Sequence, residues 1–370
     1  MTSKPSKVTV LMPVFNGARY LRQAIDSILN QTYRDLEFLI VNDGSEDPTQ
    51  EIIESYRDPR IRVIHHLKNQ GLACSLNEGM DLARGEYIAR MDADDVSLPH
   101  RLSTQGAFMD EHAEVDVCGS FVKYIRNESP RLFSENKRPV EHQAICARLF
   151  VECCISHPTV IMRRSSFKKH HLYYDRAFEF CEDYELFVRA KGKLHFHNIP
   201  KALLYYRVHD DNISSKLYSS DQQRVLTKLV WCKQLLDLGI TPTQEERELH
   251  CTILNLGLVN LDDNGFNREW AARVEEWLNN LLEANQRTKV YQEELFSALI
   301  EELRNCFYLN YFYTTKPWSI SMLKVLLKQW IFISRRAGFR RAFRFPFLFL
   351  MLGRSRYEKL KRGMCHFANF

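Results

Sequence analysis

Apolar runs typical of strands alternate with stretches of helical spacing through residues 7–119. The strand-like runs are rich in β-branched residues, and the stretches between them repeat apolar residues every three or four positions. The expected strands are residues 7–15, 36–43, 61–66, 85–91 and 115–122, and the expected helices are residues 18–29, 49–56, 72–83 and 99–111. Strands that alternate with helices in this way imply βαβ units with right-handed crossovers and a mostly parallel α/β sheet.

The pattern becomes less regular after residue 120 and then turns entirely helical. Residues 154–164 are strand-like, residues 181–191 have helical spacing, and residues 193–200 and 201–209 predict two strands. Four helices are expected beyond residue 221, at residues 221–239, 243–258, 267–285 and 288–309. These patterns divide the chain into a catalytic domain (residues 1–215), a helical domain (216–315) and a C-terminal segment (316–370).

Charge is distributed unevenly along the 370 residues. Residues 316–370 hold 13 Lys and Arg and one acid, so the remaining 38 basic and 45 acidic residues give residues 1–315 a net charge of −7. The basic segment mixes Trp, Phe and Leu with its cations, a pattern that suits an amphipathic helix on an anionic membrane surface. Packing of its apolar face on the enzyme is the alternative. No nucleic-acid recognition motif accompanies the charge, so nucleic acid is not expected as a partner.

Cysteine usage and the chain ends indicate a cytoplasmic protein. The ten cysteines show no CxxC pair or metal-ligand spacing, and Cys153 and Cys154 are adjacent, which favours reduced thiols. The N-terminal residues lack the apolar core of a signal peptide. The longest charge-free apolar run near the C-terminus, residues 345–353, is far shorter than the roughly 20 residues that span a bilayer. We therefore expect a cytoplasmic protein, peripheral at the inner face of the membrane.

Polar residues gather where the predicted strands end. Asn16 follows the first strand, Asp43 the second, and the acidic run Asp92, Asp94 and Asp95 the fourth. Ligands of parallel α/β sheets bind at the carboxyl ends of the strands, so this placement indicates a binding site. Carboxylates this close oppose one another unless a cation neutralises them.

Three interpretations of the acidic run are open from the residues alone. It can be a solvated loop that caps the next helix. A calcium loop would need Gly and Glu where this chain has Ser97 and Ser103, so that option is weak. The third is a site for Mg²⁺ or Mn²⁺ shared with the phosphates of a ligand.

Several segments together resemble glycosyltransferase family 2. They are residues 12–33, 36–47 and 69–95, followed by shorter matches at 154–160, 181–186 and 206–214. The resemblance covers roughly residues 7–215. It implies the GT-A fold, a Rossmann-like mixed and mostly parallel sheet flanked by helices, with a nucleotide-binding half and an acceptor-binding half, here followed by a helical C-terminal region.

The same resemblance implies the residues that bind a UDP-sugar donor. Pro13 and Phe15 would line the nucleoside pocket, and Asp43 would accept a hydrogen bond from uracil. Asp94 would ligate the Mn²⁺ or Mg²⁺ ion that bridges the two phosphates, and His209 would complete the metal site. The full donor-binding set is Pro13, Phe15, Asp43, Asn69, Asp92, Ala93 and Asp94.

The acceptor side of the site follows from the matches at 154–160 and 181–186. The acceptor hydroxyl needs a positioned base, and the resemblance implies that Asp183 is this base. Glu182 and His157 would support the acceptor side. The alternatives are that Glu182 and Asp183 only offset a helix dipole and that His157 caps a strand. A single base opposite the leaving group implies inversion at the anomeric carbon.

The leading hypothesis is a metal-dependent inverting glycosyltransferase that acts on a glycan or lipid-linked acceptor in cell-surface polysaccharide or lipooligosaccharide synthesis. One alternative is a nucleotidylyltransferase, which would want a glycine-rich basic phosphate loop where this chain offers only Gly17 and Arg19. The other is a non-catalytic glycan-binding scaffold, which predicts missing carboxylates. The helices of the second domain are a candidate surface for homo-oligomerisation.

Histidines also occur close together at three places, as His65–His66, His170–His171 and His195 with His197. They lack partners at the spacing of metal ligands. We therefore expect them at surface or strand-alternating positions.

Overall fold

The computed structural model describes residues 6–126, 129–136, 138–209, 221–255 and 268–314. The chain divides into two compact units, residues 1–234 and residues 235–370. The predicted domain boundary at residue 215 and the predicted segment 316–370 lie outside the described residues, so both stay predictions.

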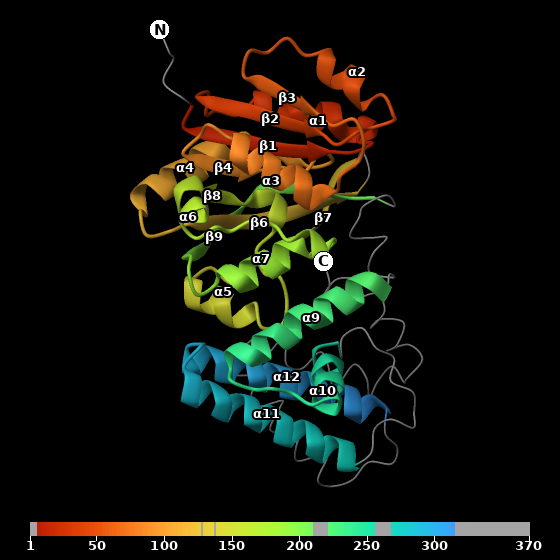
Figure 1. The fold of residues 1–370 in the computed structure, drawn as a ribbon, viewed down its shortest axis with the longest axis vertical. Helices are drawn as coiled ribbons and strands as arrows, with labels where there is room; N and C mark the ends of the chain where they lie inside the picture. The colour runs from red at the N-terminus through yellow and green to blue at the C-terminus, as the bar shows by residue number, and fades with distance from the viewer. Residues whose placement is uncertain (1–5, 127–128, 137, 210–220, 256–267, 315–370) are drawn as a thin grey trace. The chain divides into compact units, whose positions relative to one another are not determined.

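Four parallel strands make up the first part of the sheet in the first unit. They are β1 (Val8–Val14), β2 (Leu36–Asn42), β3 (Ile61–His65) and β4 (Tyr87–Arg90), in the order β3-β2-β1-β4. Figure 1 shows them side by side. Every residue of β1 and β2 is buried, as expected of apolar strands covered on both faces.

Helices connect these strands as the spacing predicts. They are α1 (Ala18–Leu29), α2 (Thr49–Glu54), α3 (Leu72–Leu82) and α4 (Arg101–Glu111). The α3 helix packs against β1 and β2. Its approach to β1 is close, because a Cβ atom at Gly79 would lie 2.2 Å from Cδ1 of Leu11.

The sheet continues past β4 with strands of both directions. The described residues form one nine-stranded sheet, in which β8 (Ile161–Arg163) runs antiparallel to β4, and β6 (Val117–Arg126) pairs in parallel with β9 (Phe196–Val208). Two edge pairings are antiparallel, β5 (Val96–Ser97) with β9 and β7 (Ser129–Asn136) with β6. The predicted mixed, mostly parallel sheet flanked by helices is thereby confirmed.

The prediction of two separate strands in residues 193–209 is wrong, because β9 is continuous from Phe196 to Val208. Its pairing with β6 shifts register where Ile199 pairs with Ser120 and Ala202 with Phe121. Pro200 lies within this irregularity. Proline lacks a backbone N–H, so it is accommodated where a strand bulges and does not have to end the strand.

The strand predicted over residues 154–164 is also only partly correct. Residues His157–Thr159 form a 3₁₀ turn, η1, with Pro158 near its start, and only β8 is extended. The helix predicted over 181–191 is confirmed as α7 (Glu182–Ala190). Short elements that the pattern did not predict are α5 (His142–Arg148), α6 (Arg164–Lys169) and the 3₁₀ turn η2 (Arg176–Phe178).

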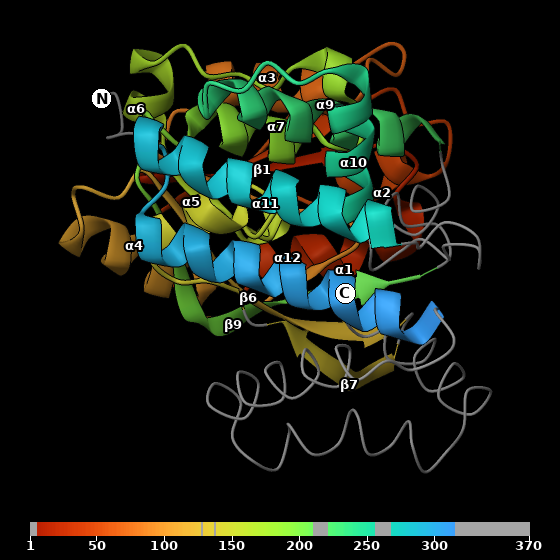
Figure 2. The same ribbon diagram turned by 90° about the horizontal axis from the view of Figure 1, so that it is seen from below.

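The helical region matches the predicted helices to within a few residues. They are α9 (Asp221–Asp237), most of which belongs to the first unit, and α10 (Gln244–Leu254), α11 (Arg268–Thr288) and α12 (Glu293–Thr314) in the second. Within the second unit α11 and α12 lie side by side (Figure 2). None of the helices that the structure describes has the length and apolarity that a membrane crossing needs.

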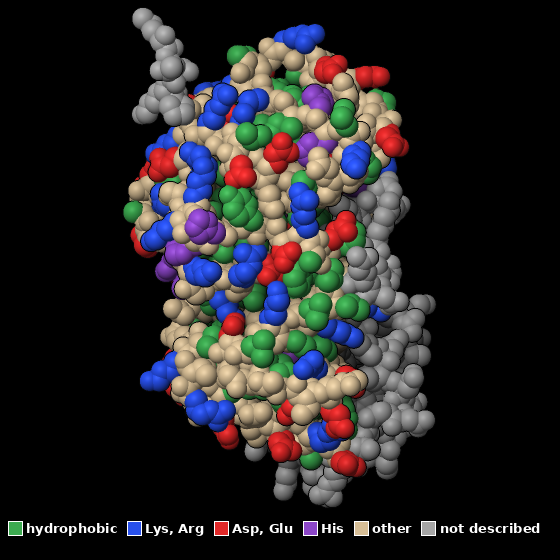
Figure 3. All heavy atoms as spheres, viewed as in Figure 1, with side chains coloured by type: hydrophobic (Ala, Val, Ile, Leu, Met, Phe, Trp, Pro, Cys, Tyr) green, Lys and Arg blue, Asp and Glu red, His purple; other side chains and the backbone are tan. Residues whose placement is uncertain are grey.

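Acidic and basic side chains are interspersed over the described part of the face seen in Figure 3. The strongly basic segment of the sequence, residues 316–370, lies outside the described residues.

Candidate active site

The loops that follow β1 and β2 are tied together at the carboxyl edge of the sheet. The backbone N–H of Asn16 donates to Ser45 Oγ (3.0 Å), and the Asn16 side-chain oxygen accepts from the N–H of Glu46 (2.8 Å). Asn16 has a φ of +50°, a conformation that asparagine tolerates better than most residues. Next to it, Phe15 is 46% exposed, whereas Pro13 is buried within β1 opposite Val41. Phe15 therefore offers an apolar ring at this edge.

Asp43 organises the loop that follows β3. Its Oδ1 accepts from the N–H of Gln70 (2.9 Å) and contacts His66 Nδ1 (2.6 Å), and its Oδ2 accepts from the N–H of Gly71 (2.9 Å). Asn69, in the same loop, accepts a second hydrogen bond from Gly71 N–H at 3.0 Å. The two predicted donor-side residues Asp43 and Asn69 are thus brought together by one loop.

The acidic run after β4 forms a compact group. One carboxylate oxygen from each of Asp92, Asp94 and Asp95 lies within 4.8 Å of the others. Ala93 lies close to the β1–α1 loop, because a Cβ atom at Gly17 would be 3.6 Å from that of Ala93. The sheet therefore places the acidic run beside the Phe15 loop.

Residues from the end of β9 hold the acidic run in place. The Arg207 N–H donates to Asp95 Oδ1 (2.8 Å), and Arg207 Nε donates to the backbone oxygen of Asp94 (2.7 Å). His209 Nε2 lies 3.0 Å from Asp94 Oδ2. Tyr20 of α1 lies against both, with the Arg207 guanidinium 4.5 Å from its ring centre and the tilted His209 ring 4.8 Å from it. His209 and Asp94, the two predicted metal ligands, are neighbours in space although 115 positions apart.

Burial raises the pKa values of two carboxyl groups in the acidic run. Burial, together with the charges of Asp94 and Asp92, raises the pKa of Asp95 well above its usual range. Burial also raises the pKa of Asp92, although the charge of Arg90 opposes this. Arg90 is buried and pairs with the Asp92 carboxylate. Arg90 thus offsets part of the negative charge of the cluster.

The donor set fits a divalent cation. Asp95 Oδ2 is buried and has no hydrogen-bond partner among the described residues, which leaves a desolvated acceptor inside the cluster. Clustered carboxylate oxygens are the ligands that hard ions such as Mg²⁺ and Mn²⁺ take. A bound divalent cation would offset the repulsion among these carboxylates, which adds to burial in raising their pKa values.

Asp183 and Glu182 lie at the N-terminus of α7, with different surroundings. Asp183 Oδ1 accepts from the N–H of Tyr184 (2.7 Å), and the Cys153 thiol donates to Asp183 Oδ2 (3.6 Å). Burial raises the pKa of Asp183. Glu182 is more deeply buried, and burial followed by the charge of Asp183 raises its pKa to about 8. Phe180, just before the helix, has a φ of +73°, a strained conformation for an aromatic residue.

The acidic run and the α7 acids influence one another. The charge of Asp183 contributes to the raised pKa of Asp92, and the charge of Arg90 lowers the pKa values of Asp92, Glu182 and Asp183 alike. Arg90 therefore lies electrostatically between the two groups of carboxylates. Arg90 pairs directly with Asp92, and its charge also acts on Glu182 and Asp183.

His157 is buried in η1 and hydrogen-bonds through Nε2 to the Tyr174 hydroxyl at 2.8 Å. Asn77 of α3 holds the backbone of Tyr174 through two hydrogen bonds of 2.8 Å each. Burial lowers the pKa of His157 well below its usual range. His157 is thus a neutral, internally bonded side chain, and its role toward an acceptor stays a prediction.

Sequence reasoning missed three residues of this region: His66, Arg90 and Cys153. A surface or strand-alternating position is expected for His66, with no role in the site, but its side chain is only 5% exposed and contacts Asp43. One signal could have found it. His66 directly follows β3 as Asp43 follows the neighbouring parallel strand β2, so both lie at the same edge. Arg90 and Cys153 carry no such signal.

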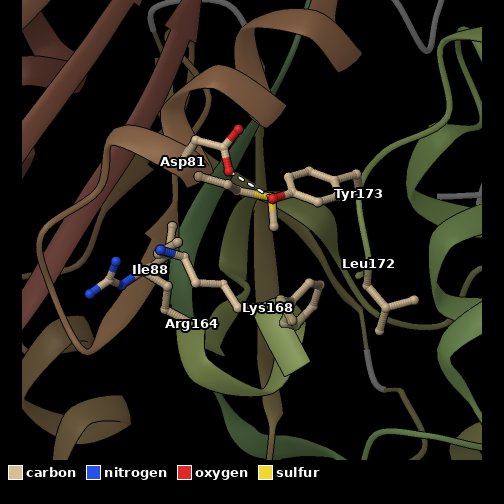
Figure 4. A pocket seen from close by; sticks show the side chains of 8 residues that line it. Asp81, Ile88, Arg164, Lys168, Leu172 and Tyr173 are labelled. Carbon is tan, nitrogen blue, oxygen red and sulfur yellow. Dashed lines mark hydrogen bonds between the residues drawn. The ribbon is translucent and has the colours of Figure 1, made fainter. Parts of the chain in front are cut away.

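A separate shallow pocket lies away from these residues, between the end of α3, β4 and α6 (Figure 4). There the Tyr173 hydroxyl donates to Asp81 at 2.8 Å, with Arg164 and Lys168 nearby. None of the predicted site residues lines it.

Comparisons with known proteins identify the family. The family model described as glycosyl transferase family 2 matches residues 9–170. An uncharacterised glycosyltransferase of Haemophilus influenzae is 31% identical over 231 residues, which cover 60% of this chain and 71% of that protein. The O-antigen biosynthesis glycosyltransferase WbnJ of Escherichia coli is 33% identical over 208 residues, which cover 55% of this chain and 80% of that protein.

Among solved structures, residues 1–349 of Staphylococcus aureus TarS in complex with UDP-GlcNAc have a similar fold. The TM-score is 0.55 with 19% identity, over 83% of this chain and 90% of that one. Fold, acidic site and relatives together define a glycosyltransferase. The chain belongs to glycosyltransferase family 2 and has the GT-A fold, as the resemblance implied, and this decides against the nucleotidylyltransferase and scaffold alternatives.

Proposed function

We propose that this enzyme transfers a sugar from a UDP-sugar to a hydroxyl of a glycan or lipid-linked acceptor, with inversion at the anomeric carbon. The observation that carries the proposal is the compact acidic run Asp92, Asp94 and Asp95 after β4, which the charge of Asp183 reaches. Two comparisons support it. TarS is described as binding UDP-GlcNAc, and WbnJ is named for O-antigen biosynthesis.

On the donor side, Phe15 and Pro13 would line the nucleoside pocket, and Asp43 would accept from uracil. Asn69, Asp92 and Ala93 would complete the surroundings of the ribose and the phosphates. Asp94 and His209, 3.0 Å apart, would hold a Mn²⁺ or Mg²⁺ ion. When bound, such an ion stabilises the charge that develops on the departing diphosphate.

On the acceptor side, Asp183 would take the proton of the incoming hydroxyl as the new bond forms. The cause of its raised pKa, burial, favours a carboxylate that accepts a proton readily. The Tyr184 N–H and the Cys153 thiol hold its two oxygens, which fixes the base relative to α7. Glu182 and His157, which are buried, would support the acceptor side of the site.

The acceptor would be part of a cell-surface polysaccharide or lipooligosaccharide, made at the inner face of the membrane. The basic amphipathic segment 316–370 would bring the enzyme to that anionic surface. The helices of the second unit would be the surface for any association between copies.

The deciding experiment is a screen of nucleotide-sugars with Mn²⁺ or Mg²⁺, in which nucleotide release is followed. We expect UDP release from a UDP-sugar, dependent on the metal and enhanced by a glycan or lipid-linked acceptor. Asp94→Ala should weaken metal-dependent binding of UDP. Nucleotide release from a GDP- or CMP-sugar in place of a UDP-sugar would overturn the donor assignment. Full activity in the presence of a chelator would overturn the proposed metal dependence.

A further inference from the structure

The buried imidazole of His66 links two carboxylates next to the predicted binding site for the nucleobase. His66 Nδ1 lies 2.6 Å from Asp43 Oδ1, and its Nε2 lies 2.5 Å from Glu78 Oε2 on α3. A neutral imidazole has one N–H, so it can donate from only one of its nitrogens. Acceptors on both sides therefore require the imidazolium form. The geometry makes His66 a cation held between two anions.

We propose that His66 is a positioning residue of the donor site. Shared between Asp43 and Glu78 as an imidazolium, it fixes the Asp43 carboxylate in the orientation that selects a base with an imide N–H, such as uracil. The inference rests on the proposed function, because it concerns the same donor, and it deepens that function by naming the device that sets base selection.

The hydrogen bonds of Asp43 leave room for one ligand donor. His66 and the Gln70 N–H occupy Oδ1, and the Gly71 N–H occupies one position on Oδ2. A carboxylate offers about four acceptor positions, so one remains on Oδ2. An imide N–H can donate to it, whereas the unprotonated ring nitrogen of cytosine would face it with a lone pair. A site built to accept one hydrogen bond strongly rejects a ligand that lacks the donor.

The orientation of Asp43 depends on the loop that His66 begins. Gly44, directly after Asp43, has a φ of +71°, and a Cβ there would lie 2.5 Å from the backbone carbon of Lys68. The backbones of the two loops are therefore in direct contact. The His66 N–H also donates to the Asn42 carbonyl at 2.9 Å. A movement of the imidazole would be transmitted directly to Asp43.

The protonation of His66 supports the same conclusion. Burial disfavours the imidazolium, but hydrogen bonds to Asp43 and Glu78 outweigh burial and raise the pKa of His66. The charged groups that face the ring are Asp43 at the end of β2 and Glu78 on α3, while Lys68 of its own loop is exposed. The cation is present at low pH and is lost as the pH rises through the raised pKa. Binding of the nucleobase should therefore weaken as the pH rises.

The test is UDP affinity of the full chain, measured by calorimetry with Mg²⁺ from about pH 6 to about pH 9. The wild-type protein should lose about tenfold in affinity as His66 deprotonates. Glu78→Gln removes one of the two anions, so the midpoint of this loss should move to lower pH while the low-pH affinity is kept. His66→Gln should abolish the transition and reduce the preference for UDP over CDP. Glu111→Gln, an exposed change of equal charge on α4, is the control and should match the wild type.

The outcomes separate this inference from the proposed function. UDP that binds with a pH profile unmoved by Glu78→Gln would overturn the role of His66 and leave the donor assignment intact. A wild-type protein that binds UDP at no pH would overturn both. Because Glu78 is partly exposed, its conservative variant should fold even if His66→Gln does not.

Discussion

Two adjacent acids at the start of α7 have different environments, and this difference separates their roles. Asp183 is partly exposed, with its oxygens held by a backbone N–H and a thiol, whereas Glu182 is buried. The partly exposed acid can reach an acceptor hydroxyl. Burial raises the pKa of the buried acid, Glu182, to about 8, which favours its uncharged form.

Asp183→Asn should remove transfer and keep donor binding. Asparagine keeps the shape of the side chain but cannot take a proton, so turnover should fall about 10²- to 10⁴-fold. UDP affinity, measured by calorimetry, should stay close to that of the wild type. Asp35→Asn, an exposed change ahead of β2, is the matched control. An undiminished rate in Asp183→Asn would show that another group is the base.

Glu182 gives the fold a pH-dependent stability. Its pKa is raised from 4.5 to about 8, first by burial, so the folded state keeps a proton that the unfolded state has lost. Stability should therefore fall as the pH rises from about 4.5 to about 8. Glu182→Gln is neutral throughout and should lose less stability across this window.

Urea denaturation of both proteins across the window measures the effect. The difference in unfolding free energy should grow with pH and then level off above about 8. The control is Glu179→Gln, a change at an exposed residue close to Glu182 in the chain. Its unfolding free energy should depend on pH as that of the wild type does. Parallel curves for Glu182→Gln and the wild type would contradict a raised pKa.

At the scale of elements, the strands and helices up to residue 122 were largely predictable because each carries its own periodicity. The irregular elements were not. β5 is two residues long and is defined only by its pairing with β9, and η1 forms where Pro158 interrupts an apolar run. Local pattern cannot reveal an element that tertiary pairing creates.

The candidate site divides in the same way. Motif residues such as Asp43, Asp94 and Asp183 could be named from sequence. The contacts of their supports could not be predicted, because Arg207 reaches Asp95 from 112 positions away and Cys153 reaches Asp183 from 30. These contacts depend on how β9 and the α5–η1 region dock, which no single-sequence pattern encodes.

The packing of α3 on β1 predicts opposite effects for two glycines. Gly79→Ala places a methyl group 2.2 Å from Leu11 and should destabilise the fold by about 1–3 kcal/mol through overpacking. At Gly106 on α4, a Cβ meets nothing within 4 Å, so alanine should stabilise by about 0.5–1 kcal/mol through helix propensity. Guanidinium denaturation measures both. A Gly79→Ala variant as stable as the wild type would contradict the close α3–β1 packing.

For the molecule as a whole, charge is separated along the chain. Residues 1–315 are net acidic, and the basic segment of residues 316–370 follows them. Such a segment attracts anionic headgroups at roughly 1 kcal/mol for each cation near the surface. The net negative charge of residues 1–315 would be repelled by the same anionic surface.

The full chain should therefore co-sediment with vesicles that contain phosphatidylserine and much less with pure phosphatidylcholine vesicles. Added salt should weaken this binding, because exposed charges are screened. A chain that ends at Thr315 should lose it. Equal binding of the two chains, or no difference between the two lipids, would remove the membrane role of the segment.

The contact of His209 with Asp94 also has a consequence for how the protein folds during its synthesis. The two residues are 115 positions apart, and β9 must pair along β6 before His209 can reach the acidic run. A nascent chain on the ribosome thus exposes Asp92, Asp94 and Asp95 long before their partners emerge. The ion site proposed for Asp94 and His209 would therefore stay incomplete until translation has passed residue 209, and free metal in the cell should not trap the nascent chain half-folded.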